Sequence, residues 1–327
     1  MSATMKDVAR RAGVSLITVS RVINETGSVR ADTRAKVLAA IEALQYIPNQ
    51  MASNLRSRQT NTLALLLPTI TNVFWTTIAR GAEDEAESCG YSLYLCNTDD
   101  DAAKEARYLE ALLRHRVGGL IVVPTAESGP ALRRLQHHEM AFVQIHRSVD
   151  GIKSDIVRGD GYGGALSLTT RLLDTGRRRV AYIGAPLATF TGRERFSGYR
   201  DALRREGMPV DPKLIRLGPV GQESGYTFVE QLLADTPRPD AIFIANSRLA
   251  LGGLRALTAA GLRLQQDIAV ASFYDIPALD DYSPFMTTII QPAYDIGRLG
   301  VRRLLKRIAS KHDALEEIIL PNLALAS

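Results

Sequence analysis

The chain is poor in the residues that build metal centres and disulfide frameworks. Its 327 residues include two cysteines, one tryptophan and five histidines. Cys89 and Cys96 lack the spacing of metal ligands, and two thiols are too few for a disulfide-stapled fold. The histidines form no ligand pattern either. We therefore expect free thiols in a reducing compartment, the cytoplasm, and neither a metal nor a cofactor.

The chain also lacks a long apolar segment. Its longest apolar runs, such as Leu63–Leu67 and Leu120–Val123, have the length of strands. A membrane-spanning helix needs about 20 apolar residues, and no N-terminal run resembles a signal peptide. A hydrophobic content of 46% with 23% charged residues is ordinary for a globular protein. These features predict a cytoplasmic protein with no membrane partner.

Signatures of common enzyme classes are missing as well. The glycines of Gly161–Gly164 do not have the spacing of a dinucleotide-binding loop, and neither a P-loop nor a Gly-x-Ser-x-Gly motif occurs. An α/β enzyme that acts on sugars or nucleotides needs a nucleophile–base set or a phosphate loop. The sequence therefore favours a protein that is not an enzyme.

The most informative pattern lies near the N-terminus, where two short amphipathic helices surround Gly13. Gly13 can take the left-handed conformation that ends a helix, and Ser15 is placed to cap the next one. The second helix is polar and basic on its outer face, so it can enter a DNA major groove. The pattern predicts a helix-turn-helix. Its apolar stripes are Val8, Ala9 and Ala12, then Val19, Val22 and Ile23; Ile17, Thr18, Ser20 and Arg21 face outward.

The distribution of charge agrees with this interpretation. The chain carries 40 basic and 35 acidic residues, a net charge of +5. Residues 1–60 contain nine basic and four acidic residues, whereas the other 267 residues contain 31 of each. The whole net positive charge therefore lies in the N-terminal fifth, as expected if that segment meets phosphates.

Beyond the first two helices the sequence predicts a third helix with a linker, and then a long α/β region. A third helix is predicted near 31–45, and Pro48 ends it. Residues 49–58 have little apolar surface to bury. We expect them to form a linker that becomes ordered only against a partner, or else a plain flexible linker. From Asn61 onward, short apolar runs alternate with amphipathic stretches. Such alternation is typical of parallel sheets covered by helices on both faces, here in two α/β subdomains.

The expected elements of this region can be given by residue range. Strands are expected at 62–67, 91–96, 119–123, 142–145, 179–183, 241–245, 268–273, 287–290 and 318–320. Helices are expected near 74–88, 102–116, 130–138, 162–174, 193–206, 224–234, 249–260 and 295–308. The last strand could return to the first subdomain, which would give several chain crossings and a hinged cleft.

By its motifs the chain resembles the LacI/GalR family of transcription repressors over nearly its whole length. The motifs are Lys6–Ala9, Gly13–Ser15, Thr18–Asn24, Tyr46–Asn49, Asn72–Trp75, Gly90–Tyr91, Asn97–Asp99, Gly118–Ile121, Arg195–Gly198 and Thr287–Pro292. The resemblance implies a homodimeric, ligand-controlled regulator of operator DNA whose core is similar to periplasmic sugar-binding proteins. It implies domains at 1–48 (helix-turn-helix), 49–60 (hinge helix) and 61–327. The last comprises a first subdomain, about 61–160 plus 289–327, and a second, about 161–288.

The resemblance also assigns residues to DNA contact. Leu16, Ile17 and Arg21 occupy base-reading positions, and Thr18 and Ser20 suit phosphate contacts. Leu55 falls on the position of a leucine wedge in the minor groove at the operator centre. The full expected set is Ser15, Leu16, Ile17, Thr18, Ser20, Arg21, Asn24, Asn49, Ala52, Leu55 and Arg56.

The expected effector site departs from the family pattern. The resemblance implies Phe74, Trp75, His146, Arg147, Arg195, Asn246, Tyr274 and Asp275 around a small-molecule effector. Three positions that are usually aspartate in sugar-responsive members are His146, Ser247 and Tyr274 here. Because carboxylates chelate sugar hydroxyls, their loss favours a sugar acid, sugar phosphate or nucleoside over a neutral sugar, unless these positions line the cleft without touching ligand.

Two other classes of protein remain as alternatives at this point. One is a transport-type solute-binding protein, which the basic N-terminal segment and the lack of a signal peptide disfavour. The other is a sugar- or nucleotide-acting α/β enzyme, which the missing catalytic sets disfavour. The sequence identifies neither the effector nor the operator, and it leaves open whether the effector releases or promotes DNA binding.

Overall fold

The structure is a computed structural model that describes residues 3–23, 26–46, 60–274, 286–310 and 313–324. The chain divides into two compact units, Met1–Thr60 and Asn61–Ser327. The expected hinge helix at 49–60 lies, except for Thr60, outside the described residues. In the described part of the chain, no helix is both long and apolar enough to cross a membrane.

The first unit contains α1 (Met5–Ala12), α2 (Leu16–Ile23) and α3 (Ala31–Ala43). The first two helices lie on either side of Gly13 as predicted, and the third begins at the predicted residue and ends two residues before the predicted end. Their apolar stripes meet in one small core, because i, i+3 and i+4 positions share a helix face. The buried members of this core are Val8, Ala9, Val19, Val22, Val37, Ala40 and Tyr46.

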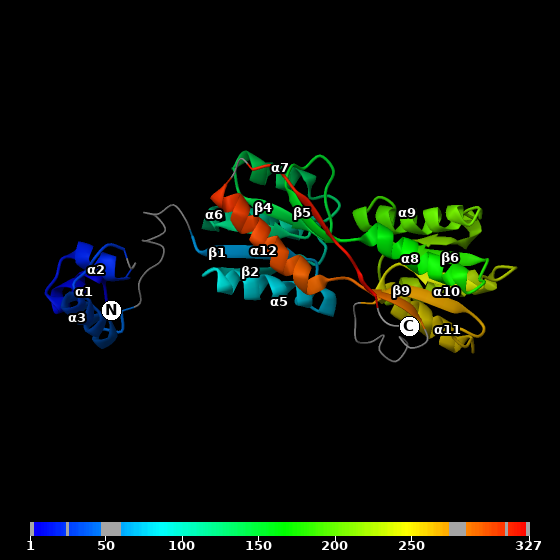
Figure 1. Ribbon diagram of the computed structural model, residues 1–327, viewed down its shortest axis with the longest axis horizontal. Helices are drawn as coiled ribbons and strands as arrows, with labels where there is room; N and C mark the ends of the chain where they lie inside the picture. Colours follow the sequence, from blue (N-terminus) through cyan, green and yellow to red (C-terminus); the bar gives the residue numbers. More distant parts are fainter. Residues whose placement is uncertain (1–2, 24–25, 47–59, 275–285, 311–312, 325–327) are drawn as a thin grey trace. The chain divides into compact units, whose positions relative to one another are not determined.

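The second unit contains two parallel sheets, each covered by helices on both faces (Figure 1). The first sheet has the strand order β11-β5-β4-β3-β1-β2. Its strands are β1 (Thr62–Leu67), β2 (Ser92–Asn97), β3 (Gly119–Val122), β4 (Phe142–Ile145), β5 (Asp155–Gly159) and β11 (Glu317–Leu320). Helices α5 (Val73–Ser88) and α12 (Ala293–Ala309) cover one face, and α6 (Ala102–His115) and α7 (Gly129–His137) cover the other.

The second sheet has the order β12-β10-β9-β8-β6-β7, with only β12 antiparallel to its neighbour. Its strands are β6 (Val180–Gly184), β7 (Ile215–Leu217), β8 (Ala241–Ile244), β9 (Ala269–Tyr274), β10 (Thr287–Ile290) and β12 (Leu323–Ala324). Helices α8 (Gly161–Asp174) and α9 (Phe190–Arg205) pack on one face, and α10 (Gln222–Ala234) and α11 (Ser247–Ala259) on the other. A short 3-10 helix spans Pro212–Leu214.

The chain crosses between the two subdomains three times in its described part, after β5, after β10 and after β11. The third crossing is the red segment in Figure 1. The expected boundary between residues 288 and 289 falls inside β10, which belongs whole to the second sheet. Residues 323–324, expected in the first subdomain, also pair in the second sheet. Strands β5, β7 and β12 were not predicted.

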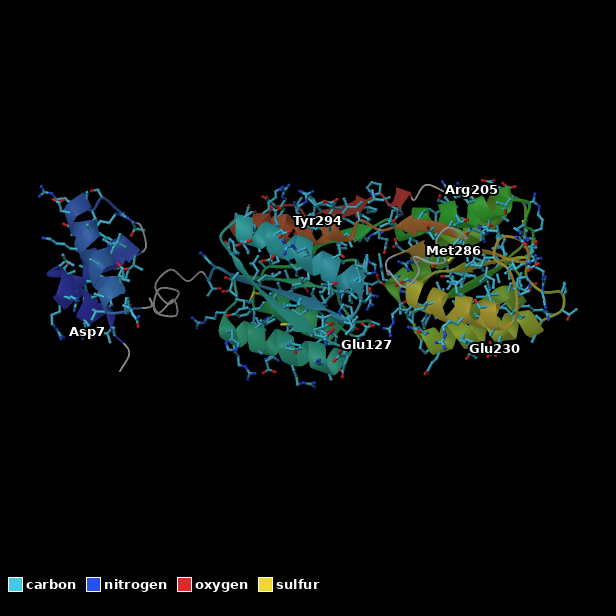
Figure 2. All side chains as sticks on the ribbon, turned by 90° about the horizontal axis from the view of Figure 1, so that it is seen from below. Asp7, Glu127, Arg205, Glu230, Met286 and Tyr294 are labelled. Atoms are coloured by element: carbon cyan, nitrogen blue, oxygen red, sulfur yellow. The ribbon has the colours of Figure 1, made fainter. Side chains whose placement is uncertain are left out.

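The first subdomain is closed by two late elements of the chain, α12 and β11. Helices α12 and α5 approach so closely that a Cβ at Gly297 would collide with the carbonyl oxygen of Ile78. Figure 2 shows Tyr294 on α12, and its hydroxyl donates to Asp84 on α5 at 3.0 Å.

A buried ion cluster fixes the same region. The Asp155 carboxylate, fully buried, accepts hydrogen bonds from Arg303 at 2.7 Å and Arg307 at 2.8 Å. It also accepts from the backbone N–H of Glu316 at 2.9 Å. Strand β5, helix α12 and the segment before β11 are therefore joined through one carboxylate.

Candidate functional site

The turn between α1 and α2 has the geometry that the sequence predicts. Gly13 ends α1 in the left-handed conformation, with φ at +66°. The Ser15 hydroxyl accepts a hydrogen bond from the backbone N–H of Thr18 at 3.1 Å, which caps the first turn of α2. The two hydroxyls of these residues are 2.9 Å apart. Together these contacts set the direction in which α2 leaves the turn.

Helix α2 is buried on one face and exposed on the other. Val19 and Val22 face the core of the first unit. On the opposite face Leu16 is 42% and Ile17 is 66% exposed, an unusual arrangement for large aliphatic side chains. Arg21 is exposed beside them, and within the described residues it has no ion pair or hydrogen bond that would hold its guanidinium.

The remaining expected DNA contacts divide into two groups. Thr18 and Ser20 are half-buried on α2, next to its exposed face. Asn24, Asn49, Ala52, Leu55 and Arg56 lie outside the described residues.

A cavity of about 580 Å³ lies between the two subdomains, at the carboxyl ends of strands from both sheets. Open α/β sheets place their ligand sites at this edge, because loops and helix N-termini converge there. The polar or aromatic side chains that line it are Thr69, Thr71, Asn72, Phe74, Trp75, Asp99, Asp100, His146, Arg147, Tyr182, Thr189, Thr191, Arg195, Asn246, Arg248 and Gln291. Six of the eight expected effector residues are therefore brought together.

An aromatic cluster forms the wall contributed by the first subdomain. The rings of Phe74 and Trp75, in the first turn of α5, have centroids 4.8 Å apart. His146, directly after β4, packs edge-on against them, at 4.9 Å from Phe74 and 5.0 Å from Trp75. Trp75 is 7% exposed, and the Arg147 guanidinium lies over its ring at 5.8 Å from the centroid. Arg147 therefore covers part of the indole face expected to stack on a ligand.

The imidazole of His146 is neutral at physiological pH. Burial lowers its pKa well below the usual value, and the guanidinium groups of Arg195, Arg147 and Arg158 lower it further. Its Nδ1 is buried and has no hydrogen-bond partner among the described residues. The residue also has a left-handed backbone, with φ at +61°, which turns the chain at the end of β4.

The opposite wall is built around Arg195, which is 6% exposed on α9. Its guanidinium donates to the carbonyl oxygen of Ala245 and, at 3.2 Å, to Oε1 of Gln291. It also stacks on Phe273, 3.9 Å from the ring centroid. Asn246 caps α11 by accepting from the backbone N–H of Arg248 at 2.9 Å. Hydrogen bonds within the protein thus fix the positions of both expected residues, Arg195 and Asn246.

The two carboxylates in the cavity wall are ion-paired. Asp99 contacts Lys104 at 2.6 Å, and hydrogen bonds from Lys104 and Asn97 lower the pKa of Asp99. Asp100 contacts Arg147 at 2.6 Å.

For three expected positions the structure shows no side chain in the wall of the cavity. Ser247 is fully buried, its Oγ lacks a partner among the described residues, and it is absent from the lining of the cavity. The backbone of Tyr274 ends β9, while its side chain and Asp275 lie outside the description.

Comparison with known proteins identifies both units. Residues 4–49 match the model of bacterial regulatory proteins of the lacI family. Residues 60–323 match the periplasmic binding proteins and sugar binding domain of the LacI family.

The chain belongs to the LacI family.

Full-length relatives agree with the two matches. The chain is 38% identical to the ribose operon repressor of Escherichia coli K12 over 308 residues, 94% of this chain and 93% of that protein. It is 34% identical to the HTH-type transcriptional regulator RegA of Clostridium saccharobutylicum, over 95% and 94% of the two chains. This LacI-family chain is therefore a DNA-binding transcription regulator.

Solved structures show the same architecture. A lac repressor dimer bound to operator and the anti-inducer ONPF is 28% identical, covers 100% of this chain and 98% of its own, and superposes with a TM-score of 0.88. The complex of the regulator CelR with cellobiose is 30% identical, covers 99% and 98%, and superposes with a TM-score of 0.76.

Sequence reasoning missed ten polar residues that line the cavity of this LacI-family regulator, and four of them show why. Asp100, Arg248 and Gln291 each come shortly after the carboxyl end of a parallel strand, where ligand sites form, so their position was an available signal. Tyr182 gave no such signal, because within β6 it resembles any buried aromatic residue. Its hydroxyl is buried and has no partner among the described residues.

Proposed function

We propose that this regulator binds a near-palindromic operator as a homodimer and that a small molecule in the inter-subdomain cavity controls the binding. The observation that carries the DNA part is the exposed outer face of α2, with Leu16, Ile17 and Arg21 held outward by the capped turn. Neither a packed core nor an ion pair in the described residues uses these side chains. A major groove offers partners to all three.

In the proposed complex each side chain has a distinct role. Arg21 donates two hydrogen bonds to one guanine, whereas Leu16 and Ile17 make apolar contacts such as those with thymine methyl groups. Ser15, Thr18 and Ser20 donate to phosphates. Contacts by Asn24 and by the hinge residues Asn49, Ala52, Leu55 and Arg56 are proposed from the family resemblance alone.

The proposed dimer uses the first subdomain. Its edge strand β2 exposes Tyr94 (55%) and Leu95 (48%), and the loop and first turn of α5 expose Ile70 (48%) and Val73 (45%). An exposed edge strand with large apolar side chains is unfavourable in a monomer. Two-fold pairing of this surface also supplies the symmetry that a palindromic operator requires.

The proposed effector is a sugar or a sugar derivative. The relatives are named for ribose and purine repression, and one solved neighbour holds cellobiose. The cavity offers an aromatic wall opposite a polar one, which suits a small molecule with both kinds of surface. Binding between two hinged subdomains changes their relative orientation, and effector and operator then alter each other's affinity reciprocally.

We further propose that the chain is not an enzyme and that it acts in the cytoplasm, where its operator is. The rival functions are a transport-type solute-binding protein and an α/β enzyme. Neither explains an exposed, basic α2 on a separate unit.

The test combines two measurements on the full-length protein. Gel-shift selection from genomic fragments should yield a site with two-fold symmetry that footprinting confirms. A thermal-shift screen of sugars, sugar acids, sugar phosphates and nucleosides should yield a ligand that stabilises by mass action and that changes operator affinity. Failure to select any DNA fragment, or turnover of a screened compound, would overturn the proposal.

A further inference from the structure

In the cavity, many hydrogen-bond acceptors are engaged by the protein itself, whereas several donors are not. This difference constrains the kind of ligand that the cavity can bind. Three side-chain amides line the cavity, and each uses its oxygen within the protein. Asn72 accepts from the backbone N–H of Phe74 at 2.9 Å, and Asn246 accepts from that of Arg248 at 2.9 Å. Gln291 accepts from Arg195 at 3.2 Å. Since an N–H must meet an oxygen, each amide turns its oxygen to these contacts, and its NH₂ donates to no partner among the described residues.

Both carboxylates and one threonine hydroxyl of the described lining are also engaged. Asp99 and Asp100 are both ion-paired, to Lys104 and Arg147. The Thr189 hydroxyl accepts from Gly192 N–H at 3.2 Å and donates to the Pro186 carbonyl at 2.7 Å. A neutral polyol needs acceptors for its hydroxyl protons, and the carboxylates that would serve best are already paired with cations. The Tyr182 hydroxyl and His146 Nδ1 are lining groups that have no partner among the described residues.

The donors, in contrast, include one cationic side chain, Arg248, that has no partner among the described residues. Three guanidinium groups line the cavity against two carboxylates. Arg147 is paired and Arg195 is bonded to its own chain, but Arg248 is exposed, in the first turn of α11, and makes no side-chain hydrogen bond or ion pair with the described residues. A charge at the rim of a cavity with a low-dielectric wall acts strongly on a ligand inside.

The neutral state of His146 is consistent with positive charge around the cavity. Protonation of His146 is opposed by its burial and then by three guanidinium groups. Burial, the largest cause, disfavours a charge of either sign there, whereas the three guanidinium groups favour an anion.

We propose that the effector carries a negative charge, as a carboxylate or a phosphate, and that Arg248 binds this group. The inference rests on the proposed function of the cavity as the effector site. The side-chain NH₂ groups of Asn72, Asn246 and Gln291 donate to the ligand's remaining oxygens. Its apolar face meets the aromatic wall at Phe74 and Trp75. Sugar acids and sugar phosphates have this combination of groups.

Pairs of ligands that differ mainly in charge test whether the negative charge of the ligand contributes to binding. Calorimetric titration of the full-length protein with ribose against ribose 5-phosphate, and glucose against gluconate, should show at least tenfold tighter binding of an anionic member, about 1.4 kcal/mol. Arg248→Gln should remove that preference by weakening the anion alone. Arg255→Gln is the control, because Arg255 is exposed on the same helix but does not line the cavity. A neutral member that binds as tightly as its anionic partner would overturn the proposal.

Inorganic phosphate tests Arg248 without a known effector. At constant ionic strength, millimolar phosphate should raise the melting temperature of wild type and Arg255→Gln more than that of Arg248→Gln. The helix-turn-helix unit is identical in all three proteins, so its own affinity for phosphate cancels. Equal shifts in the three proteins would reject the role of Arg248.

The two proposals can fail separately. If an anion binds in the cavity but leaves operator affinity unchanged, the proposed function fails and the charge preference stands. If a neutral sugar alters operator affinity and Arg248→Gln does not affect it, the function stands and the charge preference fails.

Discussion

The guanidinium of Arg195 donates a hydrogen bond to Oε1 of Gln291 at 3.2 Å, and this contact links the ligand cavity to a hinge. Arg195 belongs to α9 of the second subdomain, whereas Gln291 lies at the crossing between β10 and α12. A Cβ at Gly159, on the neighbouring crossing after β5, would lie only 3.0 Å from the Gln291 amide nitrogen. Arg195 is therefore in direct contact with a residue at the place where the chain passes between subdomains.

Gln291→Ala should weaken effector binding by about 0.5–1.5 kcal/mol, the usual contribution of one neutral hydrogen bond. It should also reduce the factor by which effector changes operator affinity, because the link to the crossing is lost. Calorimetry and operator titration with the screened ligand measure the two effects. Gln231→Ala, exposed on α10, serves as the control and should change neither value.

Arg21→Ala should cost about 1–3 kcal/mol of operator binding and relax base preference at one position, because a bidentate contact to guanine is removed. Binding to random DNA should fall much less. Lys36→Ala is the comparison, since Lys36 is exposed on α3 and should change specific and random binding alike. Footprints and base preferences that survive Arg21→Ala would remove α2 from the recognition role.

Leu55→Ala tests the role that the family resemblance gives to this residue. An apolar wedge acts only at a kinked base step, so its loss should reduce DNA bending and specific binding more than random binding. Circular-permutation gel shifts measure the bend. Equal losses on operator and random DNA would contradict a wedge.

Asp155→Asn should lower the free energy of unfolding by about 3–5 kcal/mol, because it removes one partner of a buried ion cluster and leaves two guanidinium groups undercompensated. Urea denaturation followed by circular dichroism gives the value. Asp267→Asn breaks an ion pair whose arginine, Arg263, has a side chain that is 69% exposed, and its effect on stability should be much smaller, because solvent screens an exposed pair. Similar losses in the two variants would show that Asp155 is not a structural centre.

His146 should make stability depend on pH below neutrality. Its folded pKa lies below the unfolded value of about 6.5, so under acidic conditions the unfolded chain binds a proton that the folded one excludes. The contribution is complete above pH 6.5 and falls by up to about 1.4 kcal/mol per pH unit below it. Urea titrations between pH 5.5 and 7.5 should show a weaker dependence for His146→Gln. His115→Gln, at an exposed site on α6, should match wild type.

The strands that could be predicted from sequence have no charged residue in their interior. Thr62–Leu67, Phe142–Ile145 and Thr287–Ile290 match β1, β4 and β10 to the residue. Strand β5 was missed because Asp155 and Arg158 interrupt its apolar pattern. Their charges are neutralised by tertiary partners, Arg303 with Arg307 for Asp155 and Glu194 with Glu317 for Arg158. Such partners cannot be read from a local window.

The candidate sites were predictable to different degrees for physical reasons. The turn at Gly13 and Ser15 depends on local backbone conformation and capping, which short sequence patterns encode. The cavity joins residues as distant as Trp75 and Gln291, so periodicity alone could not assemble it, and the family resemblance supplied most of its members. The engagement of the Gln291 oxygen by Arg195 depends on tertiary geometry and became visible only in the structure.

The three crossings set the order in which a ribosome can complete this protein. The unit at residues 1–60 is contiguous and can fold as soon as it emerges, since domains fold as units during synthesis. The first α/β subdomain cannot, because its core includes Ile296, Val301 and Leu304 of α12, and its sheet ends with β11. A nascent chain thus completes its helix-turn-helix unit long before the cavity between its subdomains. A chain that ended before residue 293 would contain the whole helix-turn-helix unit but would lack α12, which completes the first subdomain.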